Sequence, residues 1–253
     1  MGWLGKIFGG TIGFMMGGPL GAVAGAVFGH TLVDKGSAGT LSTQNMTALS
    51  KEKQNQLTFF VAAFSMLAKI AASDKQISEK EVSFINSFMN DDLQLDIIGK
   101  KAATRIFKAA IDSSDNFSDF AAQFYSAFHS QPQMLDLMLD ILLKVATADG
   151  SFDKQNEEMI LSAVRIFHIR EDDYLNLKSK YVSDVNKYLA VLGCDQEDSY
   201  EKIKSRFREL VRKYHPDAIA SKGLPEEFTK FSEEKFQEIH TAHEMIKKER
   251  GIV

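Results

Sequence analysis

His215, Pro216 and Asp217 stand together near the C-terminal end of this 253-residue sequence and are its first candidates for a catalytic or binding site. An imidazole beside a carboxylate could act as a general base, or it could bind another molecule. Catalysis would also need a nucleophile, and the single cysteine, Cys194, lies near the far end of the preceding predicted helix. Pro216 fixes one backbone torsion. The three residues therefore predict a rigid corner for binding, with no enzyme activity and no cofactor.

Basic side chains precede this corner on a predicted helix that ends near Lys213. The run Asp198 to Glu201 reads as a capping box that opens the helix. Lys204, Arg208 and Arg212 recur every fourth residue and so share one face. The whole chain has a net charge of -4, which argues against nucleic-acid binding, so this patch predicts a contact with an acidic protein surface. The candidate binding residues are Lys204, Arg208, Arg212, Lys213, Tyr214, His215, Pro216 and Asp217.

Apolar stripes on two predicted helices would hold the corner in place. The first helix carries Ile203, Phe207, Leu210 and Tyr214 at helical spacing, and the second carries Phe236, Ile239, Ala242, His243 and Ile246. A shorter helix from Asn186 ends at Gly193. Together these patterns predict an antiparallel pair of helices whose connection bears the His-Pro-Asp corner.

These residues resemble the J domain of DnaJ-type co-chaperones. The resemblance covers about residues 184–253 and rests on Tyr188, Leu192-Gly193, Lys213 to Asp217, and Phe236, Ile239 and Ala242. It implies docking on a DnaK-type chaperone, with stimulation of that partner's ATPase and no bond chemistry in the chain itself. Glu209 stands where the family often has a basic residue, and His243 replaces the usual tyrosine.

The middle of the chain, residues 54–181, contains an internal repeat at an offset of 75 residues. The segment from Met66 matches that from Ile141, and each copy reads as a helix, a turn opened by Asp, and a second helix. The repeats resemble the all-helical TerB-like domain. We interpret the acidic turns as helix caps, with metal binding as the lesser alternative, because they fail the EF-hand spacing. The phenylalanines here follow helical spacing and are expected in the core: Phe59, Phe60, Phe64, Phe84, Phe88, Phe107, Phe120, Phe124 and Phe128.

The first 34 residues form a glycine-rich segment that we predict to anchor the protein in a membrane. Residues 7–33 contain no charge and would extend about 40 Å as a helix, against roughly 30 Å of hydrocarbon. A cleaved signal peptide and a soluble glycine-rich arm are the alternatives. Pro19 could kink or divide the span. Glycines at four-residue spacing could form a homodimer face, at Gly9, Gly13, Gly17, Gly21 and Gly25.

The predicted fold is all-α, with a membrane segment (1–34), a flexible linker (35–53), a TerB-like domain (54–181) and a J domain (184–253). This order of parts resembles the DjlA type of membrane-anchored co-chaperone. The resemblance implies a single pass through the bacterial inner membrane, a cytoplasmic J domain, and protein clients selected by the middle domain or at the membrane. The alternative is a membrane-stress scaffold whose TerB-like domain binds an envelope partner or an ion, beside a divergent J domain.

Overall fold

The computed structural model describes residues 17–28, 50–73, 79–148, 152–182 and 187–252. Every regular element among these residues is a helix, which confirms the predicted all-α fold. The chain divides into two compact units, residues 1–127 and 128–253. The second unit holds both the later helices of the predicted TerB-like region and the whole of the predicted J domain.

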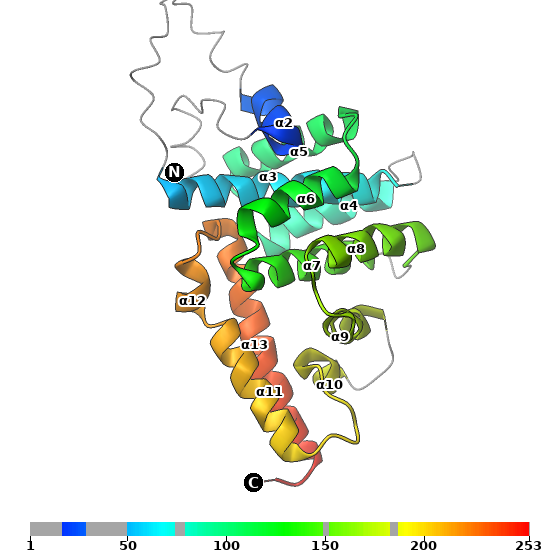
Figure 1. The fold of residues 1–253 in the computed structure, drawn as a ribbon, viewed down its shortest axis with the longest axis vertical. Helices are drawn as coiled ribbons and strands as arrows, with labels where there is room; N and C mark the ends of the chain where they lie inside the picture. Colours follow the sequence, from blue (N-terminus) through cyan, green and yellow to red (C-terminus); the bar gives the residue numbers. More distant parts are fainter. Residues whose placement is uncertain (1–16, 29–49, 74–78, 149–151, 183–186, 253) are drawn as a thin grey trace, which may run out of the picture. The chain divides into compact units, whose positions relative to one another are not determined.

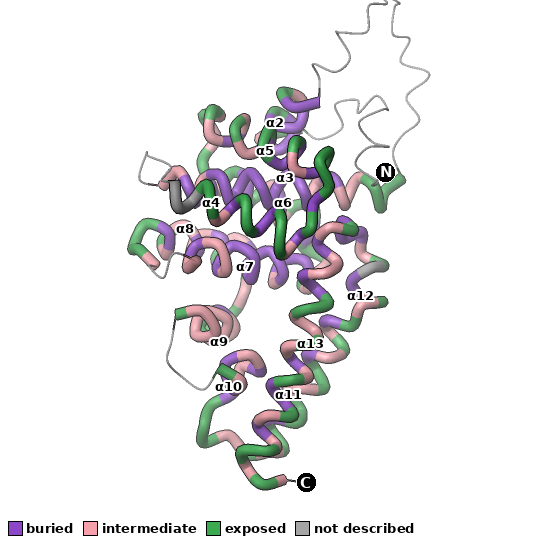
Figure 2. Tube along the Cα trace, turned by 180° about the vertical axis from the view of Figure 1, so that it is seen from behind, coloured by how far each residue is buried: buried purple, intermediate pink, exposed green. Residues whose placement is uncertain are grey.

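The first unit is built around α3. Its helices are α2 (Gly18–Phe28), α3 (Lys51–Ala71), α4 (Glu79–Ser87), a short π-helix η3 (Phe88–Asp92), α5 (Ile97–Asp112) and α6 (Phe117–Phe128), the last of which runs to the boundary. Figure 2 shows α3 as exposed at its start and almost continuously buried from Phe59 onward. Ser50 caps it by accepting a hydrogen bond from the amide of Lys53, and Asp96 caps α5 in the same way. Of the nine phenylalanines expected in the core, all are buried except Phe84 and Phe107, which are half-buried.

Helix α2 contains the described part of the predicted membrane segment. Its 11 residues span about 16 Å, and its buried side packs on α3 and α5. Leu20, Val23 and Val27 are each at most 5% exposed, and the Leu20 amide donates to the Gln123 carboxamide oxygen at 2.7 Å. No helix among the described residues is both long and apolar enough to cross a bilayer.

The predicted glycine face is only partly described. Gly17 is exposed, Gly21 is buried in the packing of α2, and Gly25 is half-buried. Gly9 and Gly13 lie outside the described residues. The dimer face therefore stays a prediction.

The second unit consists of α7 (Pro132–Ala146), α8 (Lys154–Ile166), α9 (Glu171–Val182), α10 (Lys187–Leu192), α11 (Tyr200–Lys213), α12 (Pro216–Ala220) and α13 (Glu226–Glu249). Helices α11 and α13 run side by side in opposite directions (Figure 1). The short α10 packs on α9 on one side and on α11 and α13 on the other. It therefore links the hairpin to the helices that precede it.

The internal repeat appears as two helix pairs, α3 with α4 and α7 with α8. In the second pair, Asp153 caps α8: its carboxylate accepts from the Asn156 amide at 2.7 Å and from the Asn156 side chain at 3.0 Å. Residues 74–78 and 149–151, which hold the acidic turns and Ser78, lie outside the described residues. Metal binding by those turns therefore stays an untested alternative.

The core of the hairpin follows the predicted stripes. Ile203, Leu210 and Tyr214 on α11 are buried, as are Ile239, Ala242 and Ile246 on α13. Buried and exposed positions alternate along both helices in Figure 2. His243 stacks on Phe207 with ring centroids 4.0 Å apart and planes 9° apart, so the imidazole packs as an aromatic ring in the position where J domains usually have a tyrosine.

One local prediction needs correction. The cap of α11 is Ser199, which accepts from the Lys202 amide at 3.3 Å, and not Asp198. The Asp198 carboxylate instead accepts from the Asp195 amide at 3.0 Å and pairs with the ammonium of Lys202. At the His-Pro-Asp corner, Pro216 begins the short helix α12.

Candidate functional site

The corner between α11 and α12 presents His215 and Asp217 to solvent. The side chain of His215 is 49% exposed and that of Asp217 is 95% exposed. His215 is the N-cap of α12, and its Nδ1 accepts from the Asp217 amide at 3.3 Å. The edge of its ring contacts Phe236 of α13, with centroids 5.7 Å apart. The imidazole is thus held by its own backbone and by α13, while both polar groups remain available to a partner.

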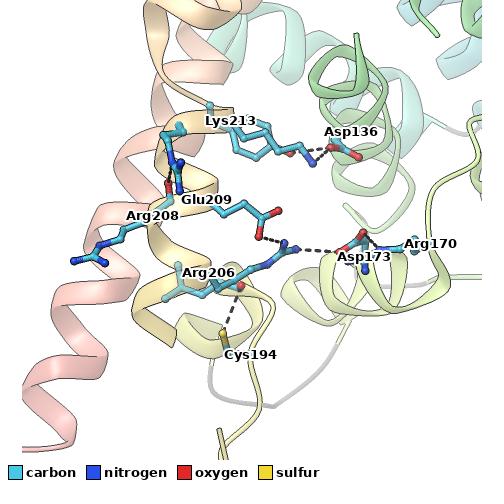
Figure 3. A network of polar contacts seen from close by, with 11 residues as sticks. Asp136, Arg170, Asp173, Cys194, Arg206, Arg208, Glu209 and Lys213 are labelled. Carbon is cyan, nitrogen blue, oxygen red and sulfur yellow. Dashed lines mark hydrogen bonds and ion pairs between the residues drawn. The ribbon is translucent and has the colours of Figure 1, made fainter. Parts of the chain in front are cut away.

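The basic face beside this corner is open as well. Lys204, Arg208 and Arg212 are all exposed on α11. Figure 3 shows the Arg208 guanidinium pointing away from the acidic residues of the neighbouring helices. These three cations share one face of α11, the helix that leads into the corner, and their exposure lets them bind an acidic surface.

Two other predicted site residues, Lys213 and Tyr214, bind within the chain. The Lys213 ammonium forms an ion pair with Asp136 of α7 (Figure 3). The Tyr214 hydroxyl donates to the same carboxylate at 3.5 Å, and its side chain is buried. Burial and the charge of Asp136 raise the pKa of Tyr214 well above its ordinary value, so the hydroxyl stays protonated.

Arg206 forms a second link between α11 and the preceding helices. Its guanidinium lies 3.0 Å from an oxygen of Asp173 on α9 and 2.9 Å from one of Glu209. Burial would raise the pKa of Asp173, but the hydrogen bond from Arg170 and the charge of Arg206 lower it overall. Glu209 therefore neutralises an inward-facing arginine, and the exposed basic face is left intact.

A third link centres on Asp140 of α7, whose side chain is fully buried. Its carboxylate lies 2.7 Å from Lys235 of α13 and accepts from the Tyr181 hydroxyl at 2.7 Å. Lys180 lies 3.6 Å from it and 2.7 Å from Glu238. Burial favours protonation of Asp140, yet the charges of Lys180 and Lys235 hold its pKa well below the ordinary value.

This arrangement suits recognition rather than bond chemistry. Cys194 is buried, and burial together with the nearby Asp198 raises the pKa of its thiol to about 11. Its sulfur lies 3.6 Å from the carbonyl oxygen of Leu192, on α10. The corner offers instead an imidazole ring and a carboxylate, and α11 offers three exposed cations.

Three acidic partners, Asp136, Asp140 and Asp173, were missed at the sequence level. Asp136 and Asp140 stand four residues apart in the otherwise apolar helix Pro132–Ala146 and so share one face. Buried acids in an apolar run need partners. That pattern predicts an ion pair but does not identify the basic residue that completes it.

Comparison with known proteins resolves what this combination is. Three family models match: the tellurite resistance protein TerB at residues 60–179, the DnaJ domain at residues 187–251, and the co-chaperone DjlA transmembrane domain at residues 1–40. These matches identify the chain as a DjlA-like J-domain co-chaperone. It is similar over its full length to co-chaperone proteins DjlA, with 28% identity in Coxiella burnetii and 26% in Escherichia coli K12 and Salmonella typhimurium, each covering 100% of both chains.

The matches bear out several predictions made from the residues alone. The protein is a membrane J-domain co-chaperone, and the TerB-like and J-domain resemblances are confirmed. The match to the transmembrane model includes α2, which is packed on α3 and α5 in the first unit. No solved structure matches the chain.

Proposed function

We propose that this DjlA-like chain docks on a DnaK-type chaperone through the corner at His215 to Asp217 and the basic face of Lys204, Arg208 and Arg212, and stimulates its ATPase. The proposal rests on one observation: His215 and Asp217 are both exposed, and they directly follow the helix that carries the exposed cations. A DnaJ-domain match supports the same partner. No step requires bond chemistry in this chain.

The geometry suggests separate roles for the basic face of α11 and for the corner at His215 to Asp217. Exposed cations steer an acidic surface into contact and hold it there. His215 and Asp217 then offer hydrogen-bonding groups in a direction fixed by the N-cap and by Phe236. Binding to one state of the partner better than to the other shifts its population toward hydrolysis.

A single-turnover ATPase assay of a DnaK-type chaperone tests this function, using the full chain in detergent micelles. His215→Gln should abolish stimulation, because Gln has neither the ring nor its edge contact with Phe236. His129→Gln is the matched control, since His129 is an exposed histidine of the TerB-like region. Equal stimulation by His215→Gln and the unaltered chain would refute the proposed function.

We further propose that residues 1–34 anchor the chain by a single pass in the bacterial inner membrane, that residues 35–50 tether the TerB-like domain (54–181), and that the J domain (184–253) faces the cytoplasm. The predicted linker ends at residue 53, but helix α3 already begins at Lys51. A partner that hydrolyses ATP supports this orientation. Ser221, exposed after α12, offers a position for a reporter thiol. Ser221→Cys should react with an impermeant maleimide only after the inner membrane is opened; reaction in intact spheroplasts would reverse the orientation.

We propose that protein clients are selected by the TerB-like domain or by position at the membrane. We also propose that the glycine face associates two copies of the chain. Gly21 is buried in α2, so its replacement would also disturb the first unit. The sharper test replaces Gly9, Gly13 and Gly17 with Leu, because space is open around Gly17. Association in a membrane two-hybrid assay should fall. Ala22→Leu with Ala26→Leu, both at exposed positions, is the control.

A further inference from the structure

Asp136 of α7 contacts both residues that immediately precede the His-Pro-Asp corner. Its carboxylate pairs with the Lys213 ammonium and accepts from the Tyr214 hydroxyl at 3.5 Å. Tyr214 is the C-cap of α11, so its position sets where the chain turns into His215. The end of α11 is therefore fixed by a helix of the TerB-like region, 78 residues earlier in the sequence.

A second chain of contacts reaches the corner from α13. Asp140, one turn after Asp136 on α7, holds the ammonium of Lys235 at 2.7 Å. That ammonium lies 4.7 Å from the centre of the Tyr214 ring. The next residue, Phe236, contacts the His215 ring. Both sides of the corner thus connect to two carboxylates on the same face of α7.

These contacts leave the cations proposed to bind the chaperone exposed to solvent. Lys213 and Arg206 are 27% and 22% exposed and are bound to acids of α7 and α9. Lys204, Arg208 and Arg212 remain exposed. If α7 and α9 competed with the chaperone for α11, their acids would bind the exposed cations. They bind Arg206 and Lys213 instead, so they do not compete with it.

We propose that Asp136, supported by Asp140, is a positioning residue for the co-chaperone activity, so that helix α7 of the TerB-like region is a working part of the J-domain site. This inference rests on the proposed function. It assigns Asp136 no contact with the chaperone. The residue acts by holding Lys213 and Tyr214, and through them the direction in which His215 and Asp217 are presented.

Positioning and binding predict different kinetic signatures. The exposed cations set how much co-chaperone is needed for half-maximal stimulation, and Asp136 leaves them unchanged. Because the cations hold the chaperone whether or not the corner is placed correctly, only the bound complexes with a correctly placed corner are productive, and the maximal stimulated rate falls with their fraction. Losing the contacts of one carboxylate, about 0.5–1.5 kcal/mol, should therefore make Asp136→Asn lower the maximal rate about three- to tenfold, with a half-saturating concentration within about twofold of the original.

The test measures DnaK ATPase stimulation by the full chain over a range of co-chaperone concentrations. Asp136→Glu retains the carboxylate and should recover most of the maximal rate. Asp172→Asn removes an exposed acid one residue before Asp173 on α9, and it should leave both parameters unchanged. Melting of each variant by circular dichroism identifies any loss that comes from unfolding.

Each outcome decides the matter. An unchanged maximal rate in a folded Asp136→Asn variant, together with abolition by His215→Gln, overturns the positioning role and leaves the proposed function standing. A raised maximal rate also overturns it, since α7 would then restrain the corner. A loss explained entirely by unfolding, with no deficit below the melting transition, assigns Asp136 to stability alone. Full stimulation by His215→Gln removes the proposed function and this inference with it.

Discussion

The ammonium of Lys235 lies 2.7 Å from the carboxylate of Asp140, and the two residues belong to helices on opposite sides of the J-domain boundary. Asp140 is fully buried, and Lys180 and Tyr181 complete its set of partners. Removing one member of a buried ionic group leaves the others without compensation, which costs about 3–5 kcal/mol. This network thus makes the stability of α13 depend on α7.

Asp140→Asn should therefore lower the free energy of unfolding of the full chain's second unit by about 3–5 kcal/mol. The carboxamide is isosteric but leaves Lys180 and Lys235 without a buried anion. Urea denaturation followed by circular dichroism measures the change. Asp172→Asn, at an exposed site, should change the free energy by less than about 0.5 kcal/mol. Equal effects of the two variants would show that the buried network contributes little.

Acid should reveal the same network through the pKa of Asp140, which lies below its ordinary value of 3.8 in the folded protein. A lowered folded pKa means that the stabilisation is complete above about pH 4 and is lost as the pH falls further. The stability difference between the unaltered chain and Asp140→Asn should accordingly be constant from pH 7 to about 5 and shrink below about pH 4. Denaturation curves that stay equally separated down to pH 2.5 would contradict this assignment.

His243 gives the J domain a pH dependence that a tyrosine at this position would not. Burial against Phe207 and Tyr200 lowers its pKa from 6.5, because charging the ring in this stack is unfavourable. Glu244, whose carboxylate lies 3.5 Å from Nδ1, and the cation of Lys247 face the same ring. Folding therefore favours the neutral imidazole. The stability that His243 contributes is highest above about pH 6.5 and declines as the pH falls below that value, because the unfolded chain binds the proton more readily.

We expect the melting temperature of the full chain's second unit to fall between pH 7 and pH 5, and His243→Tyr and His243→Phe to remove part of that dependence. Neither replacement ring titrates in this range. Thermal unfolding followed by circular dichroism at several pH values measures the slopes. Identical slopes for all three chains would assign the pH dependence to other groups.

Local rules explain why much of the hairpin could be predicted from the sequence. The spacing of Ile203, Leu210 and Tyr214 identifies the buried side of α11, and Gly193, with φ of 63°, ends α10 where a left-handed residue is needed. The exposure of Lys204, Arg208 and Arg212 follows from the same period. These features depend on neighbours only a few residues away.

The contacts that organise the site around α7 depend on long-range packing and could not be predicted in the same way. Asp136 meets Tyr214 across 78 residues, and nothing in either local sequence specifies the other. The positions of α7 and α9 likewise decide which basic residues of α11 are bound within the chain. Arg206 and Lys213 meet acids on these helices, whereas Lys204, Arg208 and Arg212 stay exposed. The cap of α11 moved from Asp198 to Ser199 because Asp198 is already occupied by Lys202 and the Asp195 amide.

Arg206 and Arg208 offer a matched pair for separating these two roles of the basic helix. Arg208 is exposed and points away from the acidic residues (Figure 3), whereas Arg206 binds Asp173 and Glu209. Arg208→Ala should raise the concentration for half-maximal ATPase stimulation about three- to tenfold, equivalent to about 0.7–1.4 kcal/mol of binding, and change the stability by less than about 0.5 kcal/mol.

Arg206→Ala should give the reverse pattern. Losing two carboxylate partners of a partly buried guanidinium should lower the free energy of unfolding by about 1–2 kcal/mol, with half-saturation changed by less than about twofold. Raising the salt concentration should weaken stimulation by the unaltered chain more than by Arg208→Ala, because salt screens the exposed cation first. If Arg206→Ala and Arg208→Ala raise the half-saturating concentration equally, the chaperone must displace Asp173 from Arg206 when it docks. Arg206 and Lys213 would then belong to the binding surface.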